Sequence, residues 1–158
     1  MNEKDRTAKR ILFVCTGNSC RSVMAEGLFK KMTEDRRAEY SVMSAGISAP
    51  DGFPATPDTL HVLEGEGVDM SGHASQRLRP EMVLAADKVF VMEKFHKDWV
   101  LKLVPQAAGK VHLLTEFAPN DDFGGQEDIP DPIRMSANFY KNVLVVIRRC
   151  IERIVQAV

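Results

Sequence analysis

The chain has 158 residues, the size of one domain, and folding at this length buries about 70% of the surface that the unfolded chain exposes. Its 21 lysines and arginines nearly balance 22 aspartates and glutamates, which excludes the strong net charge typical of proteins that bind nucleic acid or anionic membranes. No apolar run approaches the roughly 20 residues of a membrane span, and residues 1–10 lack the apolar stretch of a signal peptide. We therefore expect a cytoplasmic protein with a loose N-terminal tail over residues 1–9 and a single domain over residues 10–158.

The first predicted elements are a strand, a polar loop and a helix. Residues 10–15 form a short, mostly apolar run rich in β-branched and aromatic residues, which is typical of a buried parallel strand. Residues 21–37 repeat apolar side chains near helical spacing and predict a helix. Residues 39–46 predict a second strand that ends in a glycine turn.

The middle of the chain continues this alternation. A helix is predicted over residues 56–67, with Thr56 at its cap and a proline at its first position. A third strand over residues 86–92, a helix over residues 94–104 and a fourth strand over residues 109–114 follow.

The last predicted helix runs from a Ser136 cap to the end of the chain. Strands that alternate with helices predict a parallel sheet covered on both faces, which is a three-layer α/β sandwich with four strands. The segment 117–135 is rich in Gly, Pro and Asp and is long for a plain connection, so we expect it to be functional or disordered.

Three cysteines, Cys15, Cys20 and Cys150, are an odd number, and no Cys-x-x-Cys or histidine-rich spacing indicates zinc or a disulfide framework. At least one thiol should therefore be free. We expect no metal and no cofactor. Cys150 lies among valines and isoleucines of the last helix, where a free cysteine is usually a small core residue.

The sequence CTGNSCRS, residues 15–22, follows the first strand and is called the cysteine loop below. Ligands of open α/β sheets bind at the carboxyl ends of the strands, which is where this loop should lie. Gly17 permits a tight turn, Asn18 tolerates a left-handed conformation, and several amide hydrogens can converge on one anion at the start of the next helix. Cys15 and Arg21 bracket five residues, so the sulfur can lie below a bound oxyanion while Arg21 binds two of its oxygens.

The loop matches neither nucleotide-binding motif, since it lacks both Gly-Lys-Ser/Thr and Gly-x-Gly-x-x-Gly. A helix start and an arginine favour the thiolate of Cys15, which would then be a nucleophile. The structural alternative is a strand-end loop with a buried cysteine.

The segment VCTGNSCRSVMAEGLF resembles the signature of the low-molecular-weight protein tyrosine phosphatase family, which includes protein-arginine phosphatases and thioredoxin-linked arsenate reductases. The resemblance continues through SAG at 44–46, SGHASQ at 71–76 and DPI at 131–133. It implies a phosphatase I-like fold with a phosphate-binding loop after the first strand. It also implies a phosphorylated protein as substrate.

The resemblance implies a two-step reaction. Cys15 would attack phosphorus to form a phosphocysteine, Arg21 and the loop amides would bind the equatorial oxygens, and Asp131 would act as general acid and then as base. The phosphate-binding positions implied by the family are Thr16, Gly17, Asn18, Ser19, Cys20 and Ser22. Within this set, the Ser22 hydroxyl would hold the thiolate, and Cys20 would form a reversible disulfide with Cys15. Ser44 and His73 would support the loop together with Asn18.

Other interpretations of these polar residues stay open. Asp131 precedes a proline and is also typical of a turn, and Asp128 is its rival as the acid. His73 has a structural role in the family. The remaining histidines show no evident partner in the sequence and are expected to be surface or packing residues: His61, His96 and His112.

Departures from the family pattern concern the substrate. Tyrosine phosphatases of the family carry an aliphatic residue where this chain has Ser19, an aromatic residue where it has Ile133, and aromatic side chains in the loop where it has only Phe53. Arginine phosphatases carry threonine at the position of Ser19. Phe53 or Tyr140 remain as aromatic partners for a phosphotyrosine ring, so phosphotyrosine is the default substrate and phosphoarginine a close alternative.

Two further functions are weaker candidates. An arsenate reductase needs two more cysteines near residues 80–100, and that segment contains none. A non-catalytic anion-binding module would be expected to lose Cys15, Arg21 or Asp131, and all three are present. The sequence does not indicate an oligomeric state.

Overall fold

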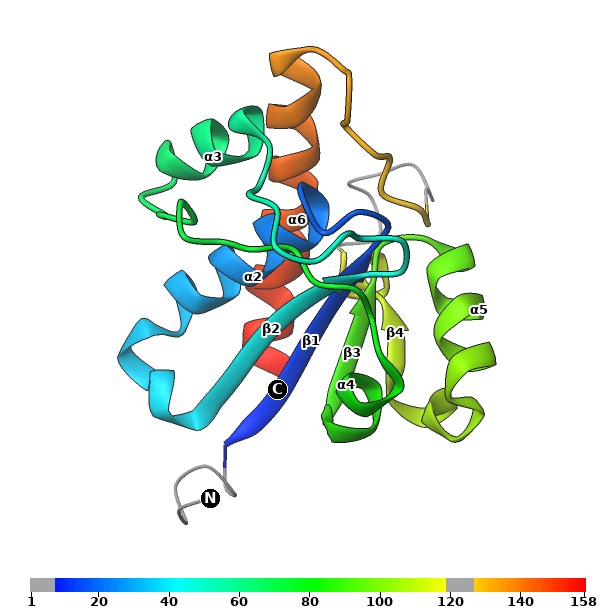
Figure 1. Ribbon diagram of the computed structural model, residues 1–158. Helices are drawn as coiled ribbons and strands as arrows, with labels where there is room; N and C mark the ends of the chain where they lie inside the picture. Colours follow the sequence, from blue (N-terminus) through cyan, green and yellow to red (C-terminus); the bar gives the residue numbers. More distant parts are fainter. Residues whose placement is uncertain (1–7, 119–126) are drawn as a thin grey trace.

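The computed structural model describes residues 8–118 and 127–158 (Figure 1). The predicted tail over residues 1–9 falls mostly on residues 1–7, which lie outside the described residues. Part of the long segment 117–135 also lies outside them, namely residues 119–126.

The core of the fold is a parallel sheet of four strands in the order β2-β1-β3-β4. The strands are β1 (Lys9–Cys15), β2 (Tyr40–Gly46), β3 (Lys88–Val91) and β4 (Val111–Leu113). All four were predicted from their apolar runs, and the four-stranded parallel sheet is confirmed.

Helices cover both faces of this sheet (Figure 1). One face carries α2 (Arg21–Met32), α3 (Pro57–Glu64) and α6 (Ala137–Ala157), and the other carries α4 (Pro80–Ala85) and α5 (Lys94–Leu103). Short 3-10 helices complete the fold: η1 (Glu34–Glu39), η2 (Pro105–Lys110) and η3 (Leu114–Phe117). The predicted three-layer α/β sandwich is therefore confirmed.

Two apolar cores follow from the alternation of side chains along each strand. In β1, Ile11 and Phe13 pack under α2 and α6, whereas Leu12 and Val14 pack under α4 and α5. Because both faces of β1 are buried, its carboxyl end is held firmly, and the cysteine loop begins there.

One local prediction was wrong, and one helix was missed. The helix predicted over residues 21–37 ends at Met32, because residues 34–37 are all charged, mostly exposed, and offer no apolar face to bury. The Thr33 hydroxyl donates a hydrogen bond of 2.7 Å to the carbonyl of Phe29 at that end. Helix α4 was not predicted, since it has six residues and buries only Val83.

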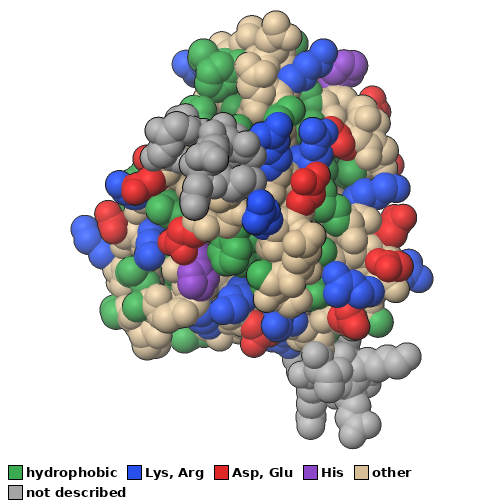
Figure 2. Space-filling view, turned by 180° about the vertical axis from the view of Figure 1, so that it is seen from behind, with side chains coloured by type: hydrophobic (Ala, Val, Ile, Leu, Met, Phe, Trp, Pro, Cys, Tyr) green, Lys and Arg blue, Asp and Glu red, His purple; other side chains and the backbone are tan. Residues whose placement is uncertain are grey.

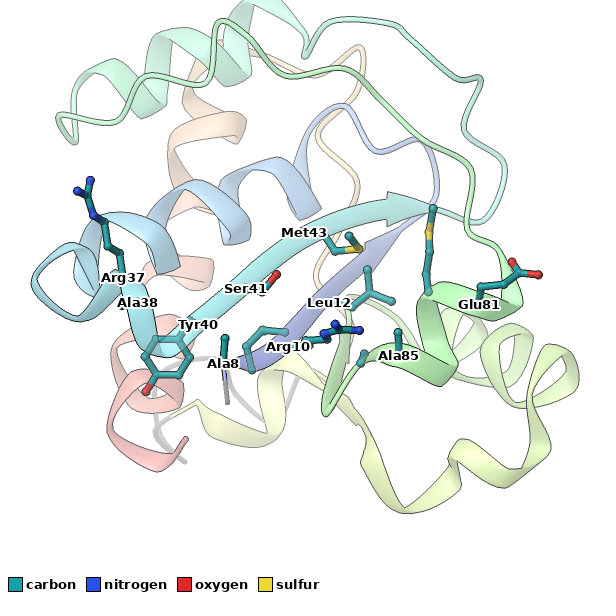
Figure 3. A pocket seen from close by; sticks show the side chains of 13 residues that line it. Ala8, Arg10, Leu12, Arg37, Ala38, Tyr40, Ser41, Met43, Glu81 and Ala85 are labelled. Atoms are coloured by element: carbon teal, nitrogen blue, oxygen red, sulfur yellow. The ribbon is translucent and has the colours of Figure 1, made fainter. Parts of the chain in front are cut away.

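The surface carries charges of both signs on the face seen in Figure 2, without a large patch of one sign. Of the described residues, none belongs to a helix whose length and apolar character would let it cross a membrane. A cavity of about 710 Å³ opens beside β1, β2 and α4 and is lined by Leu12, Met43 and Ala85 among others (Figure 3). No residue of the cysteine loop lines this cavity, so it is distinct from the site described next.

Candidate active site

The cysteine loop links the carboxyl end of β1 to the first turn of α2. Cys15 is the last residue of the strand and Arg21 the first of the helix. Asn18 has a positive φ of 52°, the left-handed conformation that its residue type was expected to tolerate. The loop is therefore a tight turn into a helix N-terminus, as the sequence predicted.

The Cys15 sulfur lies 2.9 Å from the Ser22 hydroxyl oxygen, and both side chains are buried. The Ser22 oxygen already accepts a hydrogen bond of 2.8 Å from the side-chain amide of Asn18. Its own hydrogen is then free to be donated to the sulfur, and such a bond stabilises a thiolate. The geometry suits a nucleophilic sulfur.

Asn18 is fully buried and joins the loop to the rest of the domain. Its side-chain amide donates to Ser44 (2.9 Å), and its side-chain oxygen accepts the backbone N–H of Gln76 (3.0 Å). Its carbonyl oxygen lies 2.8 Å from Nε2 of His73. The Ser44 hydroxyl in turn donates to Glu26 at 2.7 Å. The structure therefore brings together Asn18, Ser44 and His73, and it adds Glu26 and Gln76, which sequence reasoning missed.

Arg21 is buried, with only 1% of its surface exposed, and three groups lie within ion-pair or hydrogen-bond distance of its guanidinium. Nη1 donates to the Glu93 carboxylate (2.8 Å) and to the carbonyl oxygen of Ile129 (2.7 Å). Nη2 lies 3.7 Å from a carboxylate oxygen of Asp131. One edge of the guanidinium is thus fixed by the protein, and the other lies toward Asp131.

The two candidate acids differ in their surroundings. Asp128 accepts the backbone N–H of Lys94 at 2.8 Å and so caps the start of α5. Asp131 accepts the backbone N–H of Ile133 at 3.1 Å, and its side chain is 41% exposed beside Arg21. Of the two, only Asp131 has a described contact with Arg21.

His96 was expected to be a surface or packing residue, with no partner evident in the sequence; the structure buries it and gives it two polar partners. It is fully buried, its Nε2 lies 2.9 Å from the Thr16 hydroxyl, and its Nδ1 accepts the backbone N–H of Glu93 at 3.0 Å. Burial, and after it the positive charge of Arg21, lower the pKa of His96 from 6.5 to about 3. The missed signal was position, because Glu93 and His96 directly follow a strand whose carboxyl end lies beside that of β1.

Cys20 faces a second group of hydroxyls. Its sulfur lies 3.5 Å from both the Thr56 hydroxyl and the Tyr140 hydroxyl. The backbone N–H of Thr56, which caps α3, donates to the carbonyl of Ser19 at 3.1 Å. Burial raises the pKa of Tyr140 to about 12. Cys15, Cys20 and Cys150 are all unbridged and buried, so the implied disulfide between Cys15 and Cys20 stays a prediction.

The expected substrate wall is exposed. Phe53 and Ile133, the two residues expected beside the substrate, are 59% and 48% exposed. Tyr140 was the other expected aromatic partner, but it is 2% exposed and is bonded to Thr56, so it does not offer a ring face to a substrate. Among residues 8–118 and 127–158, no group of His, Cys, Asp and Glu has the arrangement of a metal site.

Comparison with known proteins agrees with this geometry. A family model described as low molecular weight phosphotyrosine protein phosphatase matches residues 10–158. The chain belongs to this family. It is therefore a protein phosphatase, and the fold and the family resemblance inferred from the sequence are both confirmed.

The relatives of this phosphatase include proteins of two named activities. A probable low molecular weight protein-tyrosine-phosphatase of Ralstonia nicotianae is 35% identical over 91% of this chain and 92% of its own length. A protein-arginine-phosphatase of Bacillus subtilis is 36% identical over 83% of this chain and 84% of its own. The crystal structure of a low molecular weight protein tyrosine phosphatase from T. tengcongensis superposes with a TM-score of 0.86 at 36% identity, covering 96% of this chain and all of that one.

Proposed function

We propose that this phosphatase hydrolyses phosphorylated protein side chains through a phosphocysteine at Cys15. The observation that carries the proposal is the 2.9 Å contact between the Cys15 sulfur and the Ser22 hydroxyl, in the same short loop as the buried Arg21. A thiolate held in this way is a nucleophile for phosphorus. The loop amides and Arg21 supply positive charge for the equatorial oxygens of the transition state.

In the first step, the thiolate of Cys15 attacks phosphorus, an S–P bond forms, and the bond from phosphorus to the side-chain oxygen or nitrogen breaks. Asp131 gives its proton to that leaving atom. In the second step, Asp131 accepts a proton from a water molecule whose oxygen attacks phosphorus. The S–P bond breaks, its electrons return to sulfur, and inorganic phosphate leaves. The 3.7 Å separation between Asp131 and Arg21 supports this assignment, because one phosphoryl group can then meet both.

Hydrolysis of para-nitrophenyl phosphate tests the chemistry. We expect turnover by the wild type and none by Cys15→Ser, because an alcohol in that position is a far weaker nucleophile. Turnover by Cys15→Ser would contradict the phosphocysteine mechanism. Absence of turnover in the wild type would favour the anion-binding module.

The choice of acid needs a matched pair of variants. Asp131→Asn should lower turnover about a hundredfold and flatten the limb of the pH profile that reports the acid, since general acid catalysis contributes about 10²–10⁴-fold. Asp128→Asn should have a smaller effect, because this side chain caps α5. The opposite order would move the role to Asp128.

The substrate is phosphotyrosine or phosphoarginine, and we propose phosphotyrosine first. Similarity alone does not separate them, since a tyrosine phosphatase and an arginine phosphatase are 35% and 36% identical to this chain. Phosphoarginine has the support of Ser19, whose hydroxyl replaces an aliphatic side chain, and phosphotyrosine has the support of Phe53, whose exposed ring is free to pack against a phosphotyrosine ring. Turnover of matched phosphotyrosine and phosphoarginine peptides decides between them, and Ser19→Ile should shift the ratio toward phosphotyrosine.

The arsenate reductase alternative gains no support from the fold. Cys150, the third cysteine, has no exposed surface and packs inside the apolar core between α6 and the sheet. It is therefore poorly placed to relay electrons to the cysteine loop.

We also propose a cytoplasmic location, a single domain over residues 10–158, and a reaction without metal, nucleic acid or membrane. The unbridged cysteines favour a reducing compartment, and the family model supports a single domain because it matches residues 10–158. The charges of both signs on the face seen in Figure 2 favour neither nucleic acid nor an anionic membrane as partner.

A further inference from the structure

Both ends of the cysteine loop contact the start of α5, one its first turn and the other the residue that caps it. Near the start of the loop, the Thr16 hydroxyl lies 2.9 Å from Nε2 of His96. At its end, Arg21 forms an ion pair of 2.8 Å with Glu93, which is the residue that precedes α5. These contacts lie on the opposite side of β1 from the Asn18 network, since β3 and β2 flank β1.

We propose that His96 is a positioning residue for catalysis, which fixes Thr16 and, with Glu93, holds the two ends of the loop at a set separation. The assignment rests on the proposed phosphatase chemistry of the same loop. The amides of such a loop act on a transition state only when they are held in place beforehand, and a small displacement lowers the rate strongly.

The direction of the hydrogen bonds supports this role. Nδ1 of His96 accepts the backbone N–H of Glu93, so the single hydrogen of the neutral ring must lie on Nε2. The ring therefore donates to the Thr16 hydroxyl oxygen. The backbone N–H of Glu93, at the start of α5, thus fixes the tautomer of His96. This tautomer holds Thr16 by its hydroxyl oxygen.

The charges that face His96 favour its neutral form. A protonated ring would gain from the Glu93 carboxylate, whose oxygen is 3.7 Å from Nε2, but it would lose the bond from the Glu93 backbone N–H and would be repelled by Arg21. Burial is the larger cause of the lowered pKa of His96, and the charge of Arg21 adds to it. The Glu93 carboxylate consequently remains the partner of Arg21, and the histidine acts through geometry without exchanging a proton.

Two substitutions of His96 separate positioning from mere filling of space. The amide nitrogen of Gln reaches about as far as Nε2, whereas the amide oxygen of Asn reaches about as far as Nδ1. His96→Asn keeps an acceptor for the Glu93 N–H and loses the bond to Thr16, so kcat/KM should fall about three- to tenfold, with a similar loss of affinity for inorganic phosphate. His96→Gln should restore most of that loss.

Thr16→Val gives an independent test, because it removes the hydroxyl and keeps the shape. Alone it should lower kcat/KM by about the same factor as His96→Asn. The double variant should lose little more than either single variant, since the same hydrogen bond is absent in each. An equal loss of kcat/KM in His96→Asn and His96→Gln, with unchanged affinity for inorganic phosphate, would overturn the proposal. So would a double variant in which the free-energy losses of the two single variants simply add.

A readout without turnover separates this proposal from the proposed function. Nitrogen-15 NMR of the wild type should show a neutral His96 ring with its hydrogen on Nε2 from neutral pH down to mildly acidic pH. A ring with its hydrogen on Nδ1, or one protonated near neutral pH, would overturn the positioning role. If the wild type lacks turnover, the proposed function fails, while the NMR result and phosphate affinity still decide the role of His96.

Discussion

Asn18, inside the cysteine loop, is fully buried and bonded to three residues from two other parts of the chain, whereas Phe53, expected at the rim of the site, is 59% exposed. The loop is fixed from both sides, by the Asn18 network next to β2 and by Glu93 and His96 next to β3. No comparable set of bonds holds the side chains of Phe53 and Ile133, whose aromatic and aliphatic groups offer only apolar surface.

The difference between the loop and the rim separates the residues that carry the chemistry from those that select the substrate. A buried network of bonds resists displacement, so the chemistry at the loop is held by the whole domain. Exposed rim residues contribute little to folding and can vary with the substrate. Substitutions in the loop should therefore change kcat or stability, and substitutions at the rim should change KM.

Among the tests of this contrast between loop and rim, the largest effect is expected for Gly46→Ala, at the end of β2. An added Cβ would lie 2.5 Å from the carbonyl oxygen of Thr16 and 2.8 Å from the backbone nitrogen of Asn18. Because both are backbone atoms of the cysteine loop, the loop must shift. We expect kcat to fall about a hundredfold and the free energy of unfolding to fall by roughly 1–3 kcal/mol. Turnover of para-nitrophenyl phosphate and urea unfolding measure the two effects.

Gly72→Ala is the matched control, since an added Cβ there meets no atom within 4 Å. Near-wild-type kcat in both variants would mean that the loop tolerates displacement, and the contrast between loop and rim would fail.

The pH dependence of stability gives the second largest effect. The folded-state pKa of His96 lies at about 3, below its value of 6.5 when unperturbed. Between these two pH values, His96 is protonated in the unfolded chain and neutral in the folded one. The contribution of neutral His96 to the free energy of unfolding is therefore fully present above pH 6.5 and is lost as the pH falls from there toward 3. His96 should account for about 2 kcal/mol of the loss between pH 7 and pH 5. In His96→Gln this contribution should vanish, as urea unfolding at both pH values can measure.

His61→Gln is the control, because it changes the same residue type at an exposed position of α3. A pH dependence in His96→Gln as steep as in the wild type would show that His96 does not resist protonation.

Much of the fold could be predicted because strands and helices repeat their apolar residues with different periods. Cys15, Arg21 and the left-handed Asn18 were predictable as well, since their residue types and spacing within one short loop carry the information. The six-residue α4 could not be predicted, because so short a helix shows no period. Its extent is set by packing on the sheet.

The partners of the loop were predictable only in part. Glu26 and Gln76 are polar residues of kinds that usually lie at the surface, and only the assembled fold places them against Ser44. Glu93 and His96 likewise resemble an ordinary helix start. Their role arises because β3 lies next to β1 in the sheet, which is a matter of topology that no local pattern reveals.

The third largest effect is expected when the hydroxyl of Tyr140, which links α6 to the cysteine loop, is removed. Its oxygen lies 3.3 Å from the Thr56 hydroxyl oxygen, a long hydrogen bond, and 3.5 Å from the Cys20 sulfur, where the bond is weak because a thiol is a poor donor and acceptor. Tyr140→Phe should lower the free energy of unfolding by about 0.5–1 kcal/mol. Because burial raises the pKa of Tyr140 to about 12, it should add no limb to the pH profile near neutrality. A lost limb in Tyr140→Phe would contradict this, and Tyr40→Phe, which removes a hydroxyl bonded to the carbonyl of Val158, is the control.

The smallest effect is expected at the rim and depends on the substrate. Phe53→Ala should leave kcat and stability near those of the wild type, because most of the ring is exposed. For a phosphotyrosine peptide, KM should rise about two- to fivefold, since a contact between two aromatic rings contributes roughly 0.5–1.5 kcal/mol. For a phosphoarginine peptide of the same sequence, KM should change less. Trp99→Ala removes another exposed aromatic side chain, on α5, and serves as the control. A fall in kcat with Phe53→Ala on both peptides would show that the rim takes part in holding the loop, and the division between a fixed cradle and a variable rim would be wrong.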